Sequence, residues 1–464
     1  MFINRQKELQ ILNDRYTKSK AEMFIIYGRR RVGKTELIRH FINGKPHVYY
    51  MADLRSNEEQ LEIVSNLLAE YFDDKILSEQ HLKNWDLVFT YIESRLESDK
   101  RFVFVIDEFP YLVNVSSSLP SIIQKHWDSR LKKKNIFLIL CGSSMSFMEK
   151  EVLSYKSPLY GRRTGQIEVN PFNYFQASEM LDGIKEEKIL EYYGVFGGIP
   201  AYLELIDQSK SIWQNIEEQI FQSDRLLYNE VNFLLMQELR TPRNYFAILR
   251  AIALGRTKIN DIVQFTGLER GVVGKYLDNL INLKIVERKV PVTEQPHKSR
   301  RGIYIISDNY FRFWFRYIYP RLTYIEEGRI KFVMDIIKKD FTSFLSVVFE
   351  NICLEFLKKN PVAIPFEFTS IGSYWDRDIE IDIVALSNRG DILLGECKYS
   401  NKKAGTDVLE NLISKGQLLK DKGKHFHYIL FAKNGFTGGL KESTKDKAVI
   451  LLDIDFDASK YKKR

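Results

Sequence analysis

The sequence predicts an α/β protein built around a parallel sheet, and three observations support this fold class. An apolar run at residues 23–27 leads into the loop 28–35 and then into a helical pattern at 36–42. Two more continuous apolar runs, 102–106 and 136–141, are typical of strands buried on both faces of a parallel sheet. Because 464 residues suffice for about three domains, we expect this sheet to occupy only the first part of the chain, residues 1–170.

The loop has the pattern Gly-x-x-x-x-Gly-Lys-Thr between a strand and a helix, the context in which this pattern binds nucleotide phosphates. Gly28 and Gly33 permit the turn, so that backbone N–H groups can surround the β-phosphate. The following helix directs its positive end at the anion. Lys34 is expected to reach the β- and γ-phosphates, and the Thr35 hydroxyl to hold Mg²⁺.

The residues between the two glycines belong to the same predicted phosphate-binding loop: Arg29, Arg30, Arg31 and Val32. The three arginines have two interpretations. They face phosphates or a partner subunit, or they are solvated loop residues. The sequence leaves this choice open.

The run that ends at Asp107 and Glu108 predicts the catalytic acids, because ligands bind at the carboxyl ends of parallel strands. Asp107 can bind Mg²⁺ through water, and Glu108 can orient and deprotonate the attacking water. An exposed acidic turn is the other interpretation. The nearby phosphate loop favours hydrolysis as well as binding.

Polar residues after the next strand are candidate sensors of the γ-phosphate. Ser143 or Ser144 could report its presence, although Gly-Ser-Ser is also an ordinary turn. Arg162 and Arg163 follow, and either could supply charge to a transferring phosphoryl group, often one bound by a neighbouring subunit. A basic surface loop explains these arginines equally well.

These residues resemble the AAA+/STAND branch of P-loop ATPases, and more narrowly the prokaryotic "archaeal ATPase" family. The resemblance covers about the first half of the chain and rests on five groups of residues: Phe2, Arg5, Glu8 and Leu9; Tyr27–Thr35; Asp107–Phe109; Cys141–Ser144; and Pro158–Arg163. It implies that the nucleotide is ATP. It also implies a helical lid over residues 171–235, whose Gly-Gly-x-Pro element ending at Pro200 packs near the adenine.

Residues 236–320 are predicted to form a winged helix-turn-helix. Three short helical patterns are followed by two alternating runs, 285–290 and 302–306, that are typical of a two-stranded wing. This combination is a DNA-binding architecture. The aromatic run 307–315 is predicted to be a packing helix.

Charge favours nucleic acid as the partner of this segment. Residues 241–302 contain twelve Lys/Arg and five Asp/Glu, which is most of the net charge of +8. Five of the cations could contact phosphates, on the third helix or in the wing: Arg270, Lys275, Lys298, Arg300 and Arg301. The alternative is that the winged helix only covers the nucleotide and senses it.

Residues 335–464 are predicted to form a second α/β domain with an acidic site. Glu350 lies on an amphipathic helix, and Asp382 lies on a strand over 378–386. Glu396 and Lys398 share one face of the next strand, because side chains alternate along a strand. Two carboxylates and a lysine can hold Mg²⁺ and position a hydroxide for phosphodiester hydrolysis.

Asp382 with Glu396-x-Lys398 resembles the core of the PD-(D/E)XK nucleases, a restriction-endonuclease-like fold. Residues 371–376 and 395–398 also resemble the uncharacterised domain that is often fused to archaeal-type ATPases. Gln417 falls where such nucleases often keep a polar residue. The alternative is an inactive copy of the fold, used for binding or assembly.

The composition limits the class of protein and its expected location. The hydrophobic fraction of 44% and the charged fraction of 28% are ordinary for a soluble globular protein. We expect no signal peptide, no membrane span and a cytoplasmic location. Cys141, Cys353 and Cys397 are expected to be buried thiols, without a disulfide or zinc site.

The first functional hypothesis is an ATPase that couples its nucleotide state to nucleic-acid binding and processing, with DNA as partner and with ATP and Mg²⁺ as cofactors. A signalling or scaffold ATPase that forms nucleotide-dependent homo-oligomers is the second hypothesis. A transcription regulator that uses only its winged helix is the third.

Overall fold

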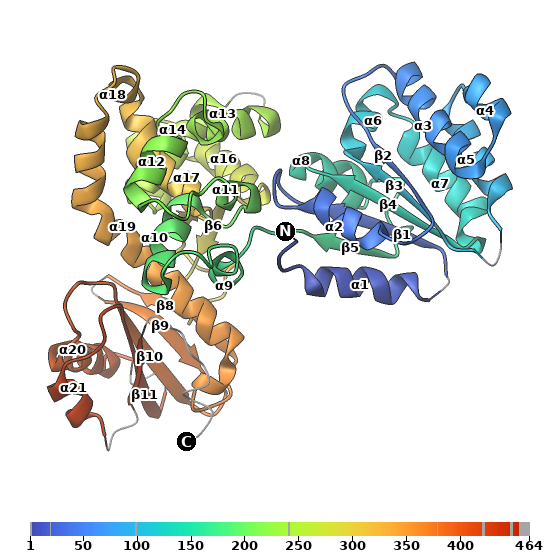
Figure 1. The fold of residues 1–464 in the computed structure, drawn as a ribbon. Helices are drawn as coiled ribbons and strands as arrows, with labels where there is room; N and C mark the ends of the chain where they lie inside the picture. The colour runs from blue at the N-terminus through green and yellow to red at the C-terminus, as the bar shows by residue number, and fades with distance from the viewer. Residues whose placement is uncertain are drawn as a thin grey trace. The chain divides into compact units, whose positions relative to one another are not determined.

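The computed structural model describes residues 2–18, 20–97, 100–239, 242–377, 379–419, 423–445 and 449–453. The chain divides into two compact units, both drawn in Figure 1. Unit 1 comprises Met1–Gln176, Ile199–Glu204 and Asn232–Arg240, and unit 2 comprises Ala177–Gly198, Leu205–Val231 and Thr241–Arg464. The chain therefore passes between the units several times.

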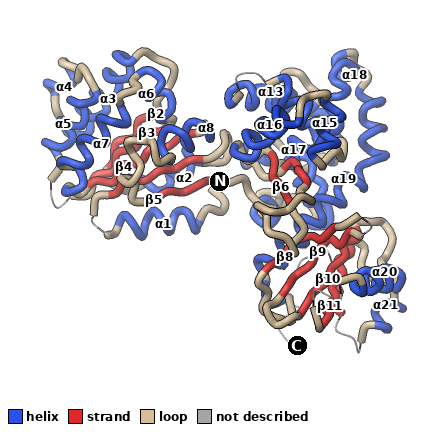
Figure 2. Tube along the Cα trace, turned by 180° about the vertical axis from the view of Figure 1, so that it is seen from behind, coloured by secondary structure: helices blue, strands red, loops and turns tan. Residues whose placement is uncertain are grey.

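Unit 1 contains a five-stranded sheet in the order β2-β3-β4-β1-β5, and all its pairs are parallel (Figure 2). Every residue of β1, β3 and β4 is buried. The predicted parallel sheet with central strands covered on both faces is confirmed. The strands are β1 (Glu22–Tyr27), β2 (His47–Met51), β3 (Phe102–Asp107), β4 (Ile136–Gly142) and β5 (Gly165–Glu168).

Helices connect these strands and flank the sheet (Figure 1). They are α1 (Gln6–Tyr16), α2 (Lys34–Ile42), α3 (Asn57–Phe72), α4 (Lys75–Glu79), α5 (Trp85–Arg95), α6 (Phe109–Val115), α7 (Leu119–Ser129), η1 (Leu131–Lys133), α8 (Met145–Phe147) and η2 (Met148–Leu153). Two short helices, α9 (Tyr174–Ser178) and α11 (Pro200–Leu203), come after β5 in the chain.

Local sequence explains where several of these helices begin. Ser56 starts α3 with a capping box that it completes with Glu59, and the Asn84 side chain caps α5. At the end of β3, Glu108 takes a left-handed backbone conformation with φ of 51°. Pro110 then lies in the first turn of α6, where its missing N–H costs nothing. This sharp strand-to-helix transition leaves Asp107 and Glu108 at the carboxyl end of β3.

The first part of unit 2 is helical, and it includes three successive helices followed by a two-stranded antiparallel sheet. In that order these elements are α14 (Arg243–Ala253), α15 (Ile259–Thr266), α16 (Arg270–Asn282), β6 (Val286–Lys289) and β7 (Ile303–Ile306). The other helices here are α10 (Glu186–Phe196), α12 (Ile212–Ile220) and α13 (Leu226–Glu238), which ends in unit 1.

The aromatic run after β7 packs inside unit 2, as predicted. It forms α17 (Asn309–Phe313) and continues as a π-helical turn, η3 (Trp314–Ile318). The large side chains of these two elements are almost fully buried. They are therefore not available as a base-stacking platform. The chain then forms η4 (Tyr319–Arg321), α18 (Leu322–Glu326) and the 30-residue helix α19 (Ile330–Lys359).

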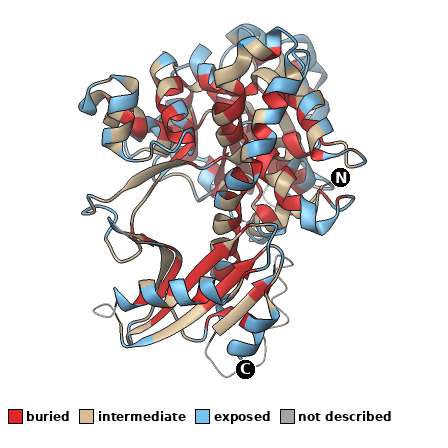
Figure 3. Ribbon diagram, turned by 90° about the vertical axis from the view of Figure 1, so that its left-hand side faces the viewer, coloured by how far each residue is buried: buried red, intermediate tan, exposed pale blue. Residues whose placement is uncertain are grey.

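A second sheet with mixed pairing follows α19, in the order β12-β11-β10-β9-β8. The β8-β9 and β9-β10 pairs are antiparallel, whereas β10-β11 and β11-β12 are parallel. Figure 3 shows buried residues concentrated on its strands. Its elements are η5 (Pro361–Ala363), β8 (Ser370–Trp375), β9 (Glu380–Leu386), β10 (Asp391–Lys398), α20 (Thr406–Gln417), β11 (His425–Ala432), α21 (Gly438–Ser443) and β12 (Val449–Asp453).

Three further sequence predictions concern a strand boundary, the cysteines and membrane helices. The strand expected from residue 378 begins at Glu380, and Asp378 lies outside the described residues. The three cysteines are buried free thiols, as expected. Within the described ranges, no helix combines the length and the apolar character needed to cross a bilayer.

Candidate active site

The loop between β1 and α2 has the geometry that its glycines predict. Gly28 has φ of 153°, and a Cβ atom there would lie 2.3 Å from the Val169 carbonyl oxygen, so no larger residue fits. Gly33 has φ of 91° and precedes α2, whose first residue is Lys34. The helix therefore begins at the position where its N–H groups can bind an anion.

Lys34 is buried, and its ammonium lies across the loop. Nζ donates to the carbonyl oxygens of Gly28 at 2.9 Å and Arg29 at 3.0 Å. The charge is thus held inside the loop before any phosphate enters. The neighbouring arginines differ from one another: Arg29 is buried, whereas Arg30 and Arg31 are exposed. Exposure makes these two arginines accessible from solvent, which both sequence interpretations allow.

The carboxylate of Asp107 is fully buried and accepts hydrogen bonds from three elements. Thr35 Oγ1 donates to Oδ2 at 2.8 Å, and the Tyr49 hydroxyl donates to the same oxygen at 2.7 Å. The Glu108 N–H donates to Oδ1 at 2.8 Å. Thr35 and Asp107, which were predicted to bind Mg²⁺ together, are in direct contact. A hydroxyl and a carboxylate side by side are oxygen ligands of the type that Mg²⁺ requires.

Tyr49 was not predicted from the sequence. It lies on β2, the edge strand next to β3, and no pattern near it in the sequence marks a functional residue. Burial, followed by the negative charge of Asp107, raises the pKa of the Tyr49 hydroxyl. The hydroxyl therefore stays protonated and continues to donate to the carboxylate at neutral pH.

Glu108 and Ser143 are neighbours, as their proposed roles require. Ser143 Oγ donates to Glu108 Oε2 at 2.8 Å, and the Ser143 N–H lies 3.3 Å from the same oxygen. The residues come from the ends of β3 and β4, which pair directly. A polar residue after β4 thus contacts the carboxylate that could activate water.

Arg5, which precedes α1, makes hydrogen bonds to the phosphate loop. Its guanidinium donates to the carbonyl oxygens of Val32 at 2.9 Å and Asn170 at 2.6 Å, and it pairs with Glu8 at 3.1 Å. The sequence comparison included Arg5 among the family residues without assigning it a role. Its contacts hold the phosphate loop against the segment that follows β5.

Arg162 and Arg163 lie in the loop between η2 and β5. The Arg162 guanidinium pairs with Asp128 at 2.9 Å, and Arg163 donates to the Leu153 carbonyl oxygen at 2.9 Å. The contacts described for Arg162 thus involve α7 and its own loop, and none joins it to Glu108. Pro200 opens the short helix α11, which packs with unit 1. Its place near adenine remains a prediction.

The parallel sheet, the phosphate loop and the paired strand-end acids define a P-loop ATPase. Residues 2–206 match a family described as an ATPase domain predominantly from Archaea. Residues 314–408 match a family described as archaeal and bacterial proteins of unknown function. The predicted family resemblance and ATPase assignment are confirmed.

An uncharacterised protein of Methanocaldococcus jannaschii is 36% identical over 462 residues, which are 98% of this chain and 99% of that protein. The chain belongs to this family of predominantly archaeal ATPases. An uncharacterised ATP-binding protein of the same organism is 22% identical over 283 residues, which are 51% of this chain and 76% of that protein. A Walker-type ATPase of Pyrococcus abyssi shares the fold, with a TM-score of 0.51 and 22% identity, over 68% of this chain and 96% of that one.

A second set of candidate residues meets on the sheet of unit 2. Asp382 on β9 lies beside β10, and its Oδ2 accepts the Cys397 N–H at 2.8 Å. Lys398 Nζ donates to Glu396 Oε1 at 2.7 Å, so these two side chains share a face, as the alternation predicted. Lys415 on α20 donates to Glu396 Oε2 at 3.1 Å. Both oxygens of Glu396 therefore bind lysine ammonium groups.

Lys415 takes the place that the sequence interpretation gave to Gln417. Gln417 is the last residue of α20 and is exposed. A helix places residues two apart on different faces, so Lys415 faces the sheet and Gln417 faces away from it.

Glu350 on α19 lies near enough to Asp382 for their negative charges to repel each other. Burial, followed by repulsion from Asp382, raises the pKa of Glu350 to about 8. Burial, followed by repulsion from Glu396, raises the pKa of Asp382 to about 6. Carboxylates crowded in this way favour a proton or a cation among them. Nevertheless, the described part of the chain holds no group of three His, Cys, Asp or Glu side chains arranged to bind one metal ion.

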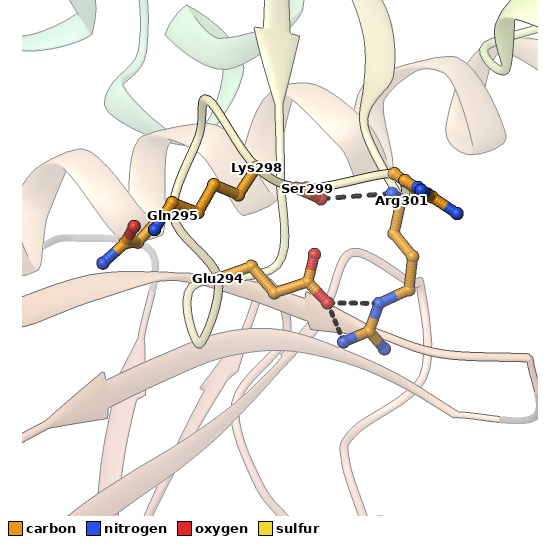
Figure 4. Close-up of a pocket in the computed structure, with 6 residues that line it drawn as sticks. Glu294, Gln295, Lys298, Ser299 and Arg301 are labelled. Carbon is orange, nitrogen blue, oxygen red and sulfur yellow. Dashed lines mark hydrogen bonds and ion pairs between the residues drawn. The ribbon is translucent and has the colours of Figure 1, made fainter.

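The basic residues predicted to contact nucleic acid fall into two classes. Arg301 pairs with Glu294, as Figure 4 shows, and with Asp376 at 3.1 Å beyond β8. Its charge is therefore used within the protein. Lys298 and Arg300 are exposed in the same β6-β7 loop and line a surface pocket of about 490 Å³. Arg270 and Lys275 are exposed on α16.

Proposed function

We propose that this ATPase couples its nucleotide state to nucleic-acid binding and processing by unit 2. The observation that carries the processing part is the juxtaposition of Asp382, Glu396 and Lys398 on neighbouring strands. Two carboxylates and a lysine on two adjacent strands can bind a divalent cation and a phosphodiester. The family membership supports the ATPase part.

In the ATP site, each residue has a role that its position supports. Lys34 binds the β- and γ-phosphates, with the N–H groups of the loop and of the first turn of α2. Thr35 and Asp107 hold Mg²⁺, which when bound neutralises charge on the phosphates. Glu108 orients the attacking water and accepts its proton, and Ser143 positions Glu108 through their hydrogen bond.

The nucleic-acid part is supported by exposed cations on α16 and in the β6-β7 loop. Arg270, Lys275, Lys298 and Arg300 can contact phosphates, because their side chains are exposed. We propose that α14 to β7 form the winged helix and present this surface. In the second sheet, Glu350, Asp382 and Glu396 are the candidate Mg²⁺ ligands, and Lys398 the candidate catalytic lysine.

The test is cleavage of labelled single- and double-stranded DNA and RNA in Mg²⁺ or Mn²⁺, with and without ATP. Wild type should cleave at least one substrate, whereas Asp382→Ala should not. Lys298→Glu with Arg300→Glu should weaken binding and reduce its salt dependence. Absent cleavage by wild type on all substrates and in both nucleotide states would remove the nuclease role.

A second candidate function is a signalling or scaffold ATPase whose C-terminal domain is an inactive copy that recruits partners. It is favoured by the two lysines, Lys398 and Lys415, whose ammonium groups pair with Glu396. Light scattering of the full chain with ADP and with an ATP analogue tests it. Nucleotide-dependent oligomers without affinity for nucleic acid would support this candidate.

A further inference from the structure

A carboxylate in the last segment of unit 1 contacts the residues that follow Ser143. Glu238 is the last residue of α13, and it lies in the segment Asn232–Arg240 of unit 1. The chain belongs to unit 2 before this segment and again after it. Glu238 is therefore attached to unit 1 by its contacts and to unit 2 by the chain on both sides.

The Glu238 carboxylate accepts three hydrogen bonds from consecutive residues after β4. The donors are Ser144 Oγ at 3.2 Å, the Met145 N–H at 3.3 Å and Ser146 Oγ at 2.9 Å. Hydrogen bonds to a charged acceptor are stronger than those between neutral groups. Three of them to one carboxylate hold residues 144–146, at the start of α8, in a defined position.

The residue just before this segment, Ser143, contacts the proposed catalytic carboxylate. Ser143 donates to Glu108 through Oγ and lies immediately before the residues that Glu238 binds. Gly142 is closely packed on a third side, because a Cβ atom there would lie 2.6 Å from Met148 Sδ and 2.9 Å from Pro110 Cδ. Gly142, which precedes Ser143, therefore has little room to move.

We propose that Glu238 is a positioning residue for ATP hydrolysis, which holds the 143–146 loop so that Ser143 keeps Glu108 in register with the attacking water. This inference rests on the proposed roles of Glu108 and Ser143. It also gives the chain a direct connection from the γ-phosphate sensor to a segment that continues into unit 2. We therefore expect exchange of ADP for ATP to change the hydrogen bonding of the segment that carries Glu238.

The experiment compares full-length Glu238→Ala, Glu238→Gln and wild type, with Gln237→Ala as control, because Gln237 is exposed on the same helix. Glu238→Ala should lower kcat by up to about 100-fold, the cost of a small misplacement at the reacting centre. The KM and the affinity for a fluorescent ATP analogue should stay within about twofold, because no phosphate contact is lost. Glu238→Gln should recover part of kcat, since its amide oxygen still accepts from a serine hydroxyl.

A double-mutant cycle separates positioning from simple stabilisation of the loop. If Glu238 acts through Ser143, then Ser143→Ala with Glu238→Ala should lower kcat no more than the stronger single variant. Hydrogen exchange of residues 226–239 should differ between ADP and an ATP analogue in wild type, and this difference should vanish in Glu238→Gln. That measurement remains informative even if Glu238→Ala folds poorly.

Two outcomes distinguish failure of this inference from failure of the proposed function. If Glu108→Gln is inactive while Glu238→Ala and Glu238→Gln keep the wild-type kcat, the inference is wrong and the role of Glu108 stands. If Glu108→Gln hydrolyses ATP at the normal rate, the proposed base is wrong. Additive losses in the double variant, with nucleotide-independent exchange, would also overturn the inference.

Discussion

Asp107 and Asp382 both lie among buried strands, yet their surroundings differ. Asp107 accepts hydrogen bonds from Thr35, Tyr49 and the Glu108 N–H, all within 2.8 Å. Asp382 accepts one backbone N–H and lies beside Glu396, and burial with this repulsion raises its pKa to about 6. Three protein donors stabilise the negative charge of Asp107, whereas the donor described for Asp382 is the Cys397 N–H.

This difference shows which groups stabilise the buried carboxylate in each unit. In unit 1, the Tyr49 hydroxyl and the Glu108 N–H orient the carboxylate of the proposed metal ligand Asp107, and these neutral donors stabilise its charge without competing as cations. In unit 2 the compensating charges are Lys398 and Lys415, and both contact Glu396. A divalent cation would have to replace or join these lysines. The five predictions below test this contrast.

The largest effect on ATP binding is expected at the phosphate loop. Lys34→Ala should weaken ATP binding by at least about 100-fold, because the buried ammonium and its contacts with charged phosphates are lost. Isothermal titration calorimetry with ATP and Mg²⁺ measures this, and circular dichroism checks the fold. Unchanged affinity would show that the preformed loop is not the nucleotide site.

Glu108→Gln should bind ATP normally and lower kcat by about 100- to 10,000-fold, since the amide cannot accept a proton from water. The hydrogen bond from Ser143 can persist, because the amide oxygen remains an acceptor. Single-turnover hydrolysis checks the chemical step separately from product release. A normal rate would transfer the role of base to another group.

Tyr49→Phe removes one of the two side-chain donors to Asp107 Oδ2. It tests whether this hydrogen bond contributes to Mg²⁺ binding. The apparent affinity for Mg²⁺ should fall about tenfold, which corresponds to one hydrogen bond to a charged group. Binding of nucleotide without metal should not change. Mn²⁺ binding followed by electron paramagnetic resonance gives a readout that does not depend on turnover, and equal Mn²⁺ affinities would contradict the prediction.

The carboxylates of unit 2 should make its stability depend on pH. The pKa of Glu350 is about 8 in the folded protein, above its ordinary value near 4.5. Between these values the folded state binds more protons than the unfolded state, so the free energy of unfolding falls as pH rises. Glu350→Gln should flatten this dependence in EDTA, as measured by urea unfolding at pH 5 and pH 8.5. A slope equal to that of wild type would show that Glu350 does not carry the proton.

The smallest effect is expected for Lys415→Met. Lys398 continues to pair with Glu396, and the Lys415 ammonium is only partly buried, so stability should change by about 1 kcal/mol or less. Urea unfolding measures it. A gain in Mn²⁺ affinity in the same variant would indicate that Lys415 competes with a cation, which sharpens the contrast with Asp107.

The sequence alone was sufficient for features made by neighbouring residues. The Gly28–Thr35 loop, the acids at the end of β3 and the Glu396-Lys398 face follow from local turn chemistry and from strand alternation. These patterns are short, and each has a defined geometry. The parallel sheet followed from the same logic, because its strands are continuous apolar runs.

Tertiary structure alone determined the partners that come from distant segments. Tyr49 reaches Asp107 across 58 positions, Glu238 reaches the 144–146 loop across more than 90, and Lys415 rather than Gln417 faces Glu396. A single tyrosine, glutamate or lysine carries no local pattern, and its function arises only when the chain packs. Local geometry therefore determined which groups could do chemistry, and packing decided which side chains hold them in place.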